Sequence, residues 1–214
     1  MIKIGYAGIL QHYEPLQKGW LQSAKDLIWT YRPKAVDPSY RSPLPLLHSL
    51  ALLKEEQLIQ NSDVQMHLWG KIDSFYEGFI NALNIDDLVH IGSYRTHQET
   101  IQTLMEMDLL FLPLEKSNST LHRNLFVPSK LFEYISLGKP ILAICEPSEV
   151  QEILEESGLG IIIPPENNYE LVTTIHQLIQ DPSLLNKYRR NDHILNHYSA
   201  ETATRKLASI FNRF

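Results

Sequence analysis

The sequence predicts an α/β protein with a doubly wound, Rossmann-like parallel sheet of about six strands and helices on both faces. Short apolar runs alternate with helical patterns six times along the chain, and this alternation requires crossover connections between parallel strands. The runs at 109–112 and 161–163 are apolar without a break, which is typical of strands buried on both faces. The whole chain, residues 1–214, is therefore predicted to form a single domain.

The predicted strands are short apolar runs, and the first stops at Gly8. The strands cover residues 2–7, 64–69, 88–91, 108–113, 140–145 and 160–163. Helices are predicted where apolar residues recur every three or four positions. They cover residues 16–31, 46–59, 74–83, 97–105, 128–137, 148–157 and, with breaks near Pro182 and His197, most of 169–214. Asp73 or Ser74 is the predicted cap of the third helix, and Gly138 and Gly158 are the predicted ends of the fifth and sixth.

Composition and charge exclude several classes of protein. The chain has 19 basic and 25 acidic residues, and no basic run exceeds the pair Arg189-Arg190. This balance disfavours a nucleic-acid binder that works mainly through charge. No apolar stretch reaches the roughly 18–20 residues of a transmembrane span, and the first residues lack a signal-peptide pattern. Cys145 lies in an apolar run and has no partner for a disulfide, so a buried thiol and a cytoplasmic location are expected.

Common catalytic and nucleotide-binding motifs are absent from the sequence. There is no G-x-x-x-x-G-K-[ST], no G-x-G-x-x-G before the first helix and no G-x-S-x-G. His193 and His197 are four residues apart and could share a helix face, but the sequence places no third ligand near them. No metal site is therefore predicted.

The segment 127–142, Val-Pro-Ser-Lys-Leu-Phe-Glu-Tyr-Ile-Ser-Leu-Gly-Lys-Pro-Ile-Leu, carries the most information about function. Pro128 in the first helical turn would leave the amides of Ser129, Lys130 and Leu131 free to bind an anion, to which Lys130 adds a full charge. Glu133, one turn further on, could accept both hydroxyls of a sugar diol. The spacing alone is equally compatible with a solvated Lys130 and with a Glu133 that only favours the helix dipole.

This segment resembles the "vPsKlfEYlaaGkPila" segment of GT-B-fold glycosyltransferases, in the large retaining group that uses nucleotide-diphosphate sugars and is often called family four. Weaker similarities extend the resemblance along nearly the whole chain in the same order. They are Ile4-Gly-Tyr-Ala-Gly8, Trp69-Gly70, His97-x-Glu99 followed by residues 108–113, and Tyr198-Ser-Ala-Glu201.

The resemblance implies a set of donor-binding residues. Glu133 would bind the ribose of the nucleotide, and the amides of Ser129, Lys130 and Leu131 would hold the diphosphate. Gly8 would approach the phosphates, and Lys18 of the pair Lys18-Gly19 would neutralise one of them. Gly92, Ser93, Tyr94 and Arg95 would cradle the base. Lys18, Lys130 and Glu133 would be the catalytic residues, and no cofactor or metal ion would be needed.

Three departures from the family pattern concern the transferred sugar more than the nucleotide. Leu125 stands where the first Glu of a Glu-x7-Glu pair is found, and Ile9 replaces an Arg that often follows the opening glycine. The spacing from Gly8 to Lys18 is also longer than usual. Polar residues of the loop before the segment could substitute, namely Asn118, Ser119, His122, Arg123 and Asn124.

Enzymes of this kind have two Rossmann-like domains, and this chain resembles the second. The expected function is the binding of a nucleotide-diphosphate sugar, expected to be a UDP-sugar, in a glycosyltransferase of polysaccharide biosynthesis. The missing partner would be an N-terminal acceptor domain, through which a peripheral membrane contact could be made. Without it, the chain is expected to be incomplete and inactive. Two alternatives are a non-catalytic nucleotide-binding or assembly domain and a GT-B-fold nucleotide-sugar epimerase.

Overall fold

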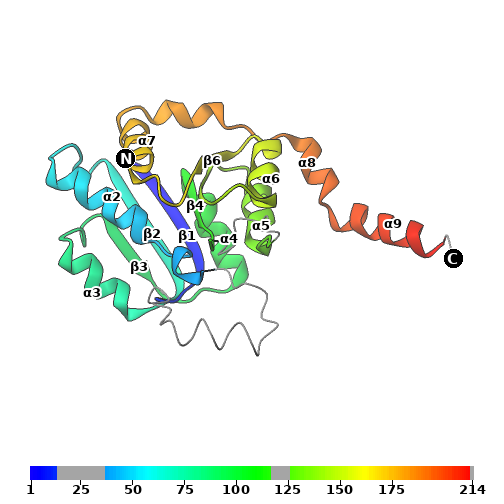
Figure 1. The fold of residues 1–214 in the computed structure, drawn as a ribbon, viewed down its shortest axis with the longest axis horizontal. Coiled ribbons are helices and arrows are strands. Elements are labelled where there is room, and N and C mark those ends of the chain that lie inside the picture. Colours follow the sequence, from blue (N-terminus) through cyan, green and yellow to red (C-terminus); the bar gives the residue numbers. More distant parts are fainter. Residues whose placement is uncertain (14–36, 117–125, 213–214) are drawn as a thin grey trace, which may run out of the picture.

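The computed structural model describes residues 1–13, 37–116 and 126–212, and it confirms the predicted fold class. One parallel sheet of six strands has the order β3-β2-β1-β4-β5-β6, with helices packed on both faces (Figure 1). The chain starts in the middle of the sheet, moves to one edge and returns through the centre to the other edge. The strand order therefore reverses between β1 and β4, where ligands of such sheets bind at the carboxyl ends of the strands.

The strands lie close to the predicted positions. They are β1 (Ile2–Leu10), β2 (Val64–Ile72), β3 (Val89–Gly92), β4 (Leu109–Pro113), β5 (Ile141–Ile144) and β6 (Gly160–Ile163). The predicted ends of the first two strands are wrong, because β1 continues past Gly8 and β2 past Gly70. These glycines pair in register and have φ values of +148° and +116°. A Cβ on Gly70 would lie 2.2 Å from the carbonyl oxygen of Gly8, so glycine permits a close approach of two backbones here.

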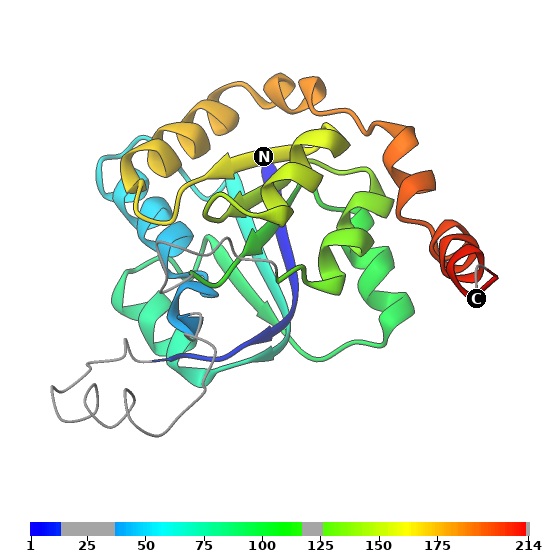
Figure 2. The same cartoon turned by 45° about the vertical axis from the view of Figure 1, so that its right-hand side comes forward.

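Helices cover both faces of the sheet (Figure 2). One face packs against α2 (Leu44–Glu55), α3 (Ser74–Ala82) and α7 (Asn168–Gln180). The other face packs against α4 (His97–Met105), α5 (Ser129–Leu137) and α6 (Glu149–Ser157). Every strand except β3 contributes residues to both apolar cores, and in β1 neighbouring side chains alternate, so that Tyr6 lies in the first core and Ala7 in the second.

The helix ends follow the local signals in the sequence. The carboxylate of Asp73 accepts a hydrogen bond from the amide of Phe75 and caps α3. Gly138 and Gly158 adopt the left-handed conformation that ends α5 and α6. The predicted helix 16–31 lies outside the described residues. Cys145 is buried, as expected.

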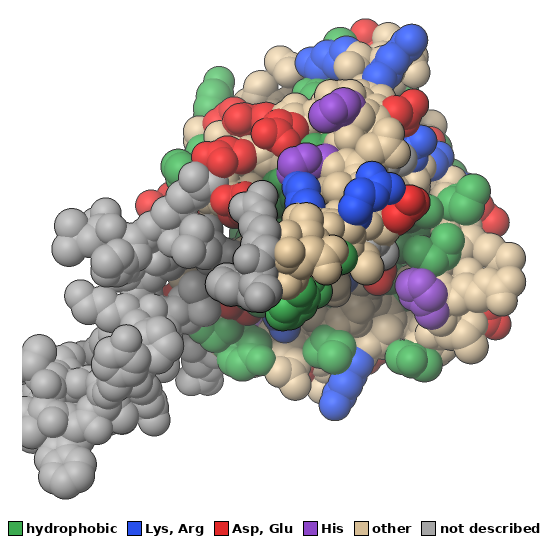
Figure 3. Space-filling model, turned by 90° about the vertical axis from the view of Figure 1, so that its right-hand side faces the viewer, with side chains coloured by type: hydrophobic (Ala, Val, Ile, Leu, Met, Phe, Trp, Pro, Cys, Tyr) green, Lys and Arg blue, Asp and Glu red, His purple; other side chains and the backbone are tan. Residues whose placement is uncertain are grey.

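The C-terminal part breaks where predicted. A 3-10 helix, η2 (Pro182–Lys187), follows α7, and α8 (Asp192–His197) and α9 (Ala200–Phe211) complete the chain. In Figure 1, α9 extends away from the sheet. His193 and His197 are exposed. Within the described ranges, no group of three or more His, Cys, Asp or Glu residues could hold a metal ion, and no helix is long and apolar enough to cross a membrane. On the face in Figure 3, basic and acidic side chains are interspersed.

Candidate ligand-binding cleft

Two adjoining cavities lie at the carboxyl ends of the central strands, where the strand order reverses. The first, of about 420 Å³, extends toward the start of α4 and is called here the α4-side chamber. The second, of about 310 Å³, lies at the end of β4 and is called the β4-side chamber. Both are lined by Gly8 and Ile9 of β1 and by Ser129 and Lys130 of α5. The two chambers therefore meet at the start of α5.

The start of α5 offers backbone donors to this junction. Pro128 is the N-cap residue, in an extended conformation, and its side chain makes no cap hydrogen bond. The amide of Leu131 donates to the Pro128 carbonyl oxygen at 3.0 Å, and the Leu131 side chain is fully buried in the core. The expectation of a free Leu131 amide is therefore wrong, because the tight first turn pairs it. The amides of Ser129 and Lys130 are the two that face the junction with the helix dipole behind them.

Lys130 is the central cation of the cleft. Its Nζ lies 3.8 Å from the centroid of the Tyr6 ring, within range of a cation–π interaction. The pKa of Lys130 is lowered to about 7, mainly by burial and in smaller part by the positive charge of Arg41, while the carboxylate of Glu133 opposes both effects. The structure thus places the Lys130 amine against Tyr6 and not in open solvent, and the ribose contact of Glu133 stays a prediction. An anion at the junction would restore the charged form of this amine.

Gly8 makes room for the Lys130 ammonium group. A Cβ at this position would lie 2.3 Å from Lys130 Nζ. The strand end beside it is held by two tyrosines: Tyr6 donates its hydroxyl to the Ile9 carbonyl at 3.1 Å, and the Ala7 amide donates to the buried Tyr134 hydroxyl at 3.3 Å. A glycine is thus needed here for two reasons: β1 approaches the Lys130 side chain of α5 closely, and the backbone has a φ of +148°.

Gly8→Ala should therefore affect both stability and the site. The added methyl group must displace Lys130, and the residue must keep a backbone conformation that costs an L-amino acid of order 1–3 kcal/mol. We expect a lower midpoint in urea unfolding, and the pKa of Lys130, measured by NMR, should rise because the displaced amine becomes more solvated. Gly78→Ala is the matched control, since a Cβ at Gly78, within α3, meets nothing within 4 Å. An unchanged Lys130 pKa in Gly8→Ala would contradict this account.

Glu133 lines the α4-side chamber together with Lys130. Glu133 is three residues after Lys130, so the two side chains share one face of α5. Tyr94 and Arg95 line the same chamber, and Tyr94 is 81% exposed. The Arg95 guanidinium lies 5.4 Å from the Trp69 ring centroid and donates through Nη1 to Thr103 Oγ1 at 2.5 Å, which fixes its position over the indole.

The structure brings together most, though not all, of the predicted site residues. Gly8, Ser129, Lys130, Glu133, Tyr94 and Arg95 all line the α4-side chamber. Gly92 and Ser93 are not among its lining residues. A Cβ on Gly92 would lie 2.3 Å from Trp69 Cδ1, so Gly92 is a packing position at the end of β3. Lys18 lies outside the described residues, as do Leu125 and the loop residues Asn118, Ser119, His122, Arg123 and Asn124.

Sequence reasoning missed several lining residues. Trp69 forms part of the α4-side chamber and is buried, and its indole Nε1 has no hydrogen-bond partner among the described residues. In the β4-side chamber, Arg41 and Glu115 form an ion pair with 3.3 Å between Nη1 and Oε1. Trp69 carries a signal in its position at a strand end. Nothing in the sequence around Arg41 and Glu115 indicates that they meet, because they are 74 residues apart.

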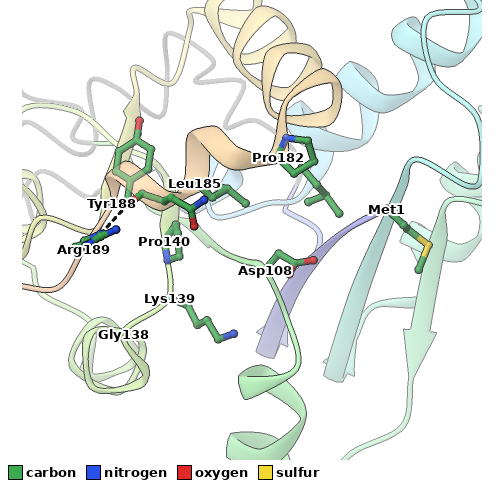
Figure 4. Close-up of a pocket in the computed structure, with 11 residues that line it drawn as sticks. Met1, Asp108, Gly138, Lys139, Pro140, Pro182, Leu185, Tyr188 and Arg189 are labelled. Carbon is green, nitrogen blue, oxygen red and sulfur yellow. Dashed lines mark hydrogen bonds between the residues drawn. The ribbon is translucent and has the colours of Figure 1, made fainter.

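A third cavity, of about 360 Å³, lies at the amino ends of the strands, away from the start of α5. Asp108, Lys139 and Arg189 surround it, as Figure 4 shows. The Asp108 carboxylate accepts a hydrogen bond from the Lys3 amide at 2.8 Å and so joins β1 to the start of β4. None of the predicted site residues lines this cavity.

Comparisons with known structures agree with this fold. The chain is similar to Anabaena Alr3699/HepE in complex with UDP-glucose, with a TM-score of 0.64 and 16% identity over 100% of this chain and 49% of that one. It is also similar to a mutant of S. aureus TarM in complex with fondaparinux, alpha-GlcNAc-glycerol and UDP, with a TM-score of 0.61 and 16% identity over 98% and 35% of the two chains. A third similar structure is WaaG, a glycosyltransferase involved in lipopolysaccharide biosynthesis, with a TM-score of 0.57 and 16% identity over 82% and 45%.

The chain thus spans about half or less of the length of these structures, and at such low identity the similarity concerns the fold. No curated protein matches the sequence significantly. The family model described as glycosyl transferases group 1 matches residues 41–193, which include β2 to β6, α5 and both chamber residues Arg41 and Glu115. The predicted family is therefore confirmed: the chain belongs to the glycosyl transferases group 1 family.

Proposed function

We propose that this chain is the donor-binding domain of a glycosyltransferase, which holds a nucleotide-diphosphate sugar while its glycosyl group passes to an acceptor hydroxyl. The observation that carries the proposal is the junction of two chambers at Lys130 and the start of α5. A nucleotide-diphosphate sugar has a charged middle and two larger, less charged ends. The cleft has the matching order, with a cation and free amides between two chambers.

The α4-side chamber is suited to the nucleoside. Its carboxylate, Glu133, can accept hydrogen bonds from the two ribose hydroxyls, as the family resemblance implies. Its lining also includes Trp69, Tyr94 and Arg95, whose rings and guanidinium suit the π-face and the polar edge of a base. The diphosphate would then lie over Gly8, within reach of Lys130 Nζ and the Ser129 and Lys130 amides.

The chemical contribution of this domain is to stabilise the leaving group. The bond between the anomeric carbon and the diphosphate oxygen breaks, its electron pair stays on the diphosphate, and the acceptor oxygen forms the new bond to carbon. Lys130 and the helix start would meet the negative charge that grows on the diphosphate. Lys18 remains a predicted second cation. We propose that these groups act without a metal ion or a cofactor.

The proposal also concerns what lies outside this domain. The acceptor would be bound by a second, N-terminal domain, and the chain by itself would bind donor without transferring the sugar. The coverage of at most 49% of the similar solved structures supports a two-part enzyme. We further propose a cytoplasmic location, which fits its single, buried, unpaired cysteine, and a role in polysaccharide synthesis, which fits the function printed for WaaG.

Nucleotide titration tests this function. UDP, GDP and ADP at millimolar concentration are added to the chain, and the melting temperature is measured. One of them should raise it, because a ligand that binds only the folded state stabilises that state. Glu133→Ala should remove the shift, whereas Glu77→Ala, an exposed acid in the first turn of α3, should keep it. A melting temperature that no nucleoside diphosphate changes would favour the alternative of a non-catalytic assembly domain.

A further inference from the structure

The β4-side chamber remains open when the nucleoside and diphosphate are assigned to the α4-side chamber and the junction. It measures about 310 Å³ and shares Ser129 and Lys130 with the α4-side chamber. Most of its wall is apolar, with Ile9 half exposed and Leu112 and Leu114 buried. The Arg41–Glu115 ion pair supplies polar groups that are not part of the α5 segment.

The ion pair is held in the wall of the chamber by backbone pairing. Residues 37–42 form a short segment before α2 that includes the 3-10 helix η1 (Pro38–Tyr40). The Asp37 amide donates to the Lys116 carbonyl at 2.6 Å, and the Lys116 amide donates back at 3.3 Å. This antiparallel bridge places Arg41 beside Glu115, one residue before Lys116. The segment is also tied to α3, because the hydroxyls of Ser42 and Tyr76 lie 3.2 Å apart.

The ion pair also lies near the junction of the two chambers. Burial is the main cause of the lowered pKa of Lys130 and of the raised pKa of Tyr6, and the charge of Arg41 adds to the first shift and opposes the second. The guanidinium is therefore within electrostatic reach of the diphosphate position. The side chains of Arg41 and Glu115 are 33% and 15% exposed. A partly exposed pair at the end of a chamber can exchange water for the hydroxyl groups of a ligand without losing its own contact.

The chemistry of the pair suits a neutral sugar. A carboxylate accepts hydrogen bonds from two neighbouring hydroxyls, and a guanidinium donates several in one plane. The apolar wall suits the C–H face of a sugar ring. A uronate carboxylate beside Glu115 would be repelled, because two negative charges would be brought together, whereas the hydroxyls of a neutral sugar would not be.

We propose that the Arg41–Glu115 ion pair recognises the glycosyl group of the donor and selects a neutral sugar with vicinal hydroxyls. The inference rests on the proposed function, since it assigns the second chamber of the same cleft. This chain has Leu125 where the family pattern has its first Glu. The ion pair would take over the contact to sugar hydroxyls that this Glu would make.

The test compares three probes on the 214-residue chain: UDP, UDP-glucose and UDP-glucuronate, with dissociation constants measured by calorimetry. The double variant Arg41→Gln/Glu115→Gln removes both charges of the pair and keeps side chains of similar size. It should bind UDP within about twofold of the wild type and UDP-glucose about tenfold more weakly, the loss expected for one or two hydrogen bonds to charged groups. The retained UDP affinity shows that the variant is folded.

A single variant sharpens the test. Wild type should prefer UDP-glucose to UDP-glucuronate, and Glu115→Gln should reverse this preference, because it leaves Arg41 to meet the uronate carboxylate. The matched control is Lys54→Gln/Asp87→Asn, which removes a surface ion pair of α2 with 2.5 Å between Nζ and Oδ1. It should leave all three dissociation constants unchanged.

The outcomes separate this inference from the proposed function. If wild type binds none of the three probes, the proposed function fails for uridine nucleotides and the inference fails with it. If wild type binds UDP, and the double variant keeps the ratio of UDP-glucose to UDP affinity, the donor site stands and the role of Arg41 and Glu115 is overturned. A wild type that binds UDP-glucuronate more tightly than UDP-glucose would also overturn the selection of a neutral sugar.

Discussion

Lys130→Met is expected to weaken UDP binding by about 10- to 100-fold at pH 6. Methionine has nearly the same length and keeps the apolar contact with Tyr6, but it removes the positive charge that lies beside Gly8 at the chamber junction. A hydrogen bond to a charged group contributes about 1.5–3 kcal/mol, and this range sets the expected loss. The measurement is calorimetric titration of UDP into each protein.

The pH dependence provides a second readout of the same residue. The pKa of Lys130 in the free chain is about 7, so the amine loses its charge as the pH rises through neutrality. A bound diphosphate favours the charged form, and the affinity of wild type should therefore fall between pH 6 and pH 9. The Lys130→Met variant should lack this dependence. Lys139→Met, at the opposite end of the strands, is the control and should bind UDP as the wild type does.

Stability should change with pH in the opposite sense. Burial holds the Lys130 pKa below its ordinary value of 10.5, so between about pH 7 and pH 10 the unfolded state binds more protons than the folded state. The contribution of Lys130 to the free energy of unfolding thus rises with pH in this window. If Lys130→Met shows the same pH profiles for affinity and stability as the wild type, the assignment of Lys130 is wrong.

Phe111→Ala is expected to reduce the free energy of unfolding by about 3–5 kcal/mol, the usual cost of removing a large buried ring. Phe111 is fully buried in the central strand β4, and its ring packs edge to face on Tyr6, with centroids 6.5 Å apart. The cavity would lie directly behind the ring that supports Lys130. UDP affinity should fall as well, because Tyr6 loses its packing partner.

Urea unfolding monitored by circular dichroism measures the effect, provided that the slope of the transition stays unchanged. Tyr169→Ala is the control. This aromatic residue is 84% exposed, so its removal should change stability by no more than about 0.5 kcal/mol. A loss of under 1 kcal/mol in Phe111→Ala would mean that the core around β4 collapses to fill the space, contrary to the close packing expected of a buried central strand.

Local signals predicted the fold well because the elements follow near-neighbour rules. The apolar run of β4 has the pattern of a strand buried on both faces, and the approximate bounds predicted for α4 agree with the structure, in which a capping box at Thr96 holds the start of the helix. The ends of β1 and β2 were wrong for a reason that local rules do not contain. Gly8 and Gly70 serve the contact between two paired strands, and a glycine with that role looks the same in the sequence as one in a turn.

The sequence by itself determined the family and the chemical type of the cleft. The segment that starts α5 places Pro128, Lys130 and Glu133 by helix geometry alone, and these positions need only a few neighbouring residues to be defined. The tertiary structure decided the rest. It brings Arg41 and Glu115 together in the lining of the β4-side chamber. It also packs Lys130 against Tyr6, where burial lowers the pKa of the amine to about 7. The physical reason is that solvation and ion pairing depend on which distant segments meet in space, whereas helix starts and strand patterns depend on neighbours along the chain.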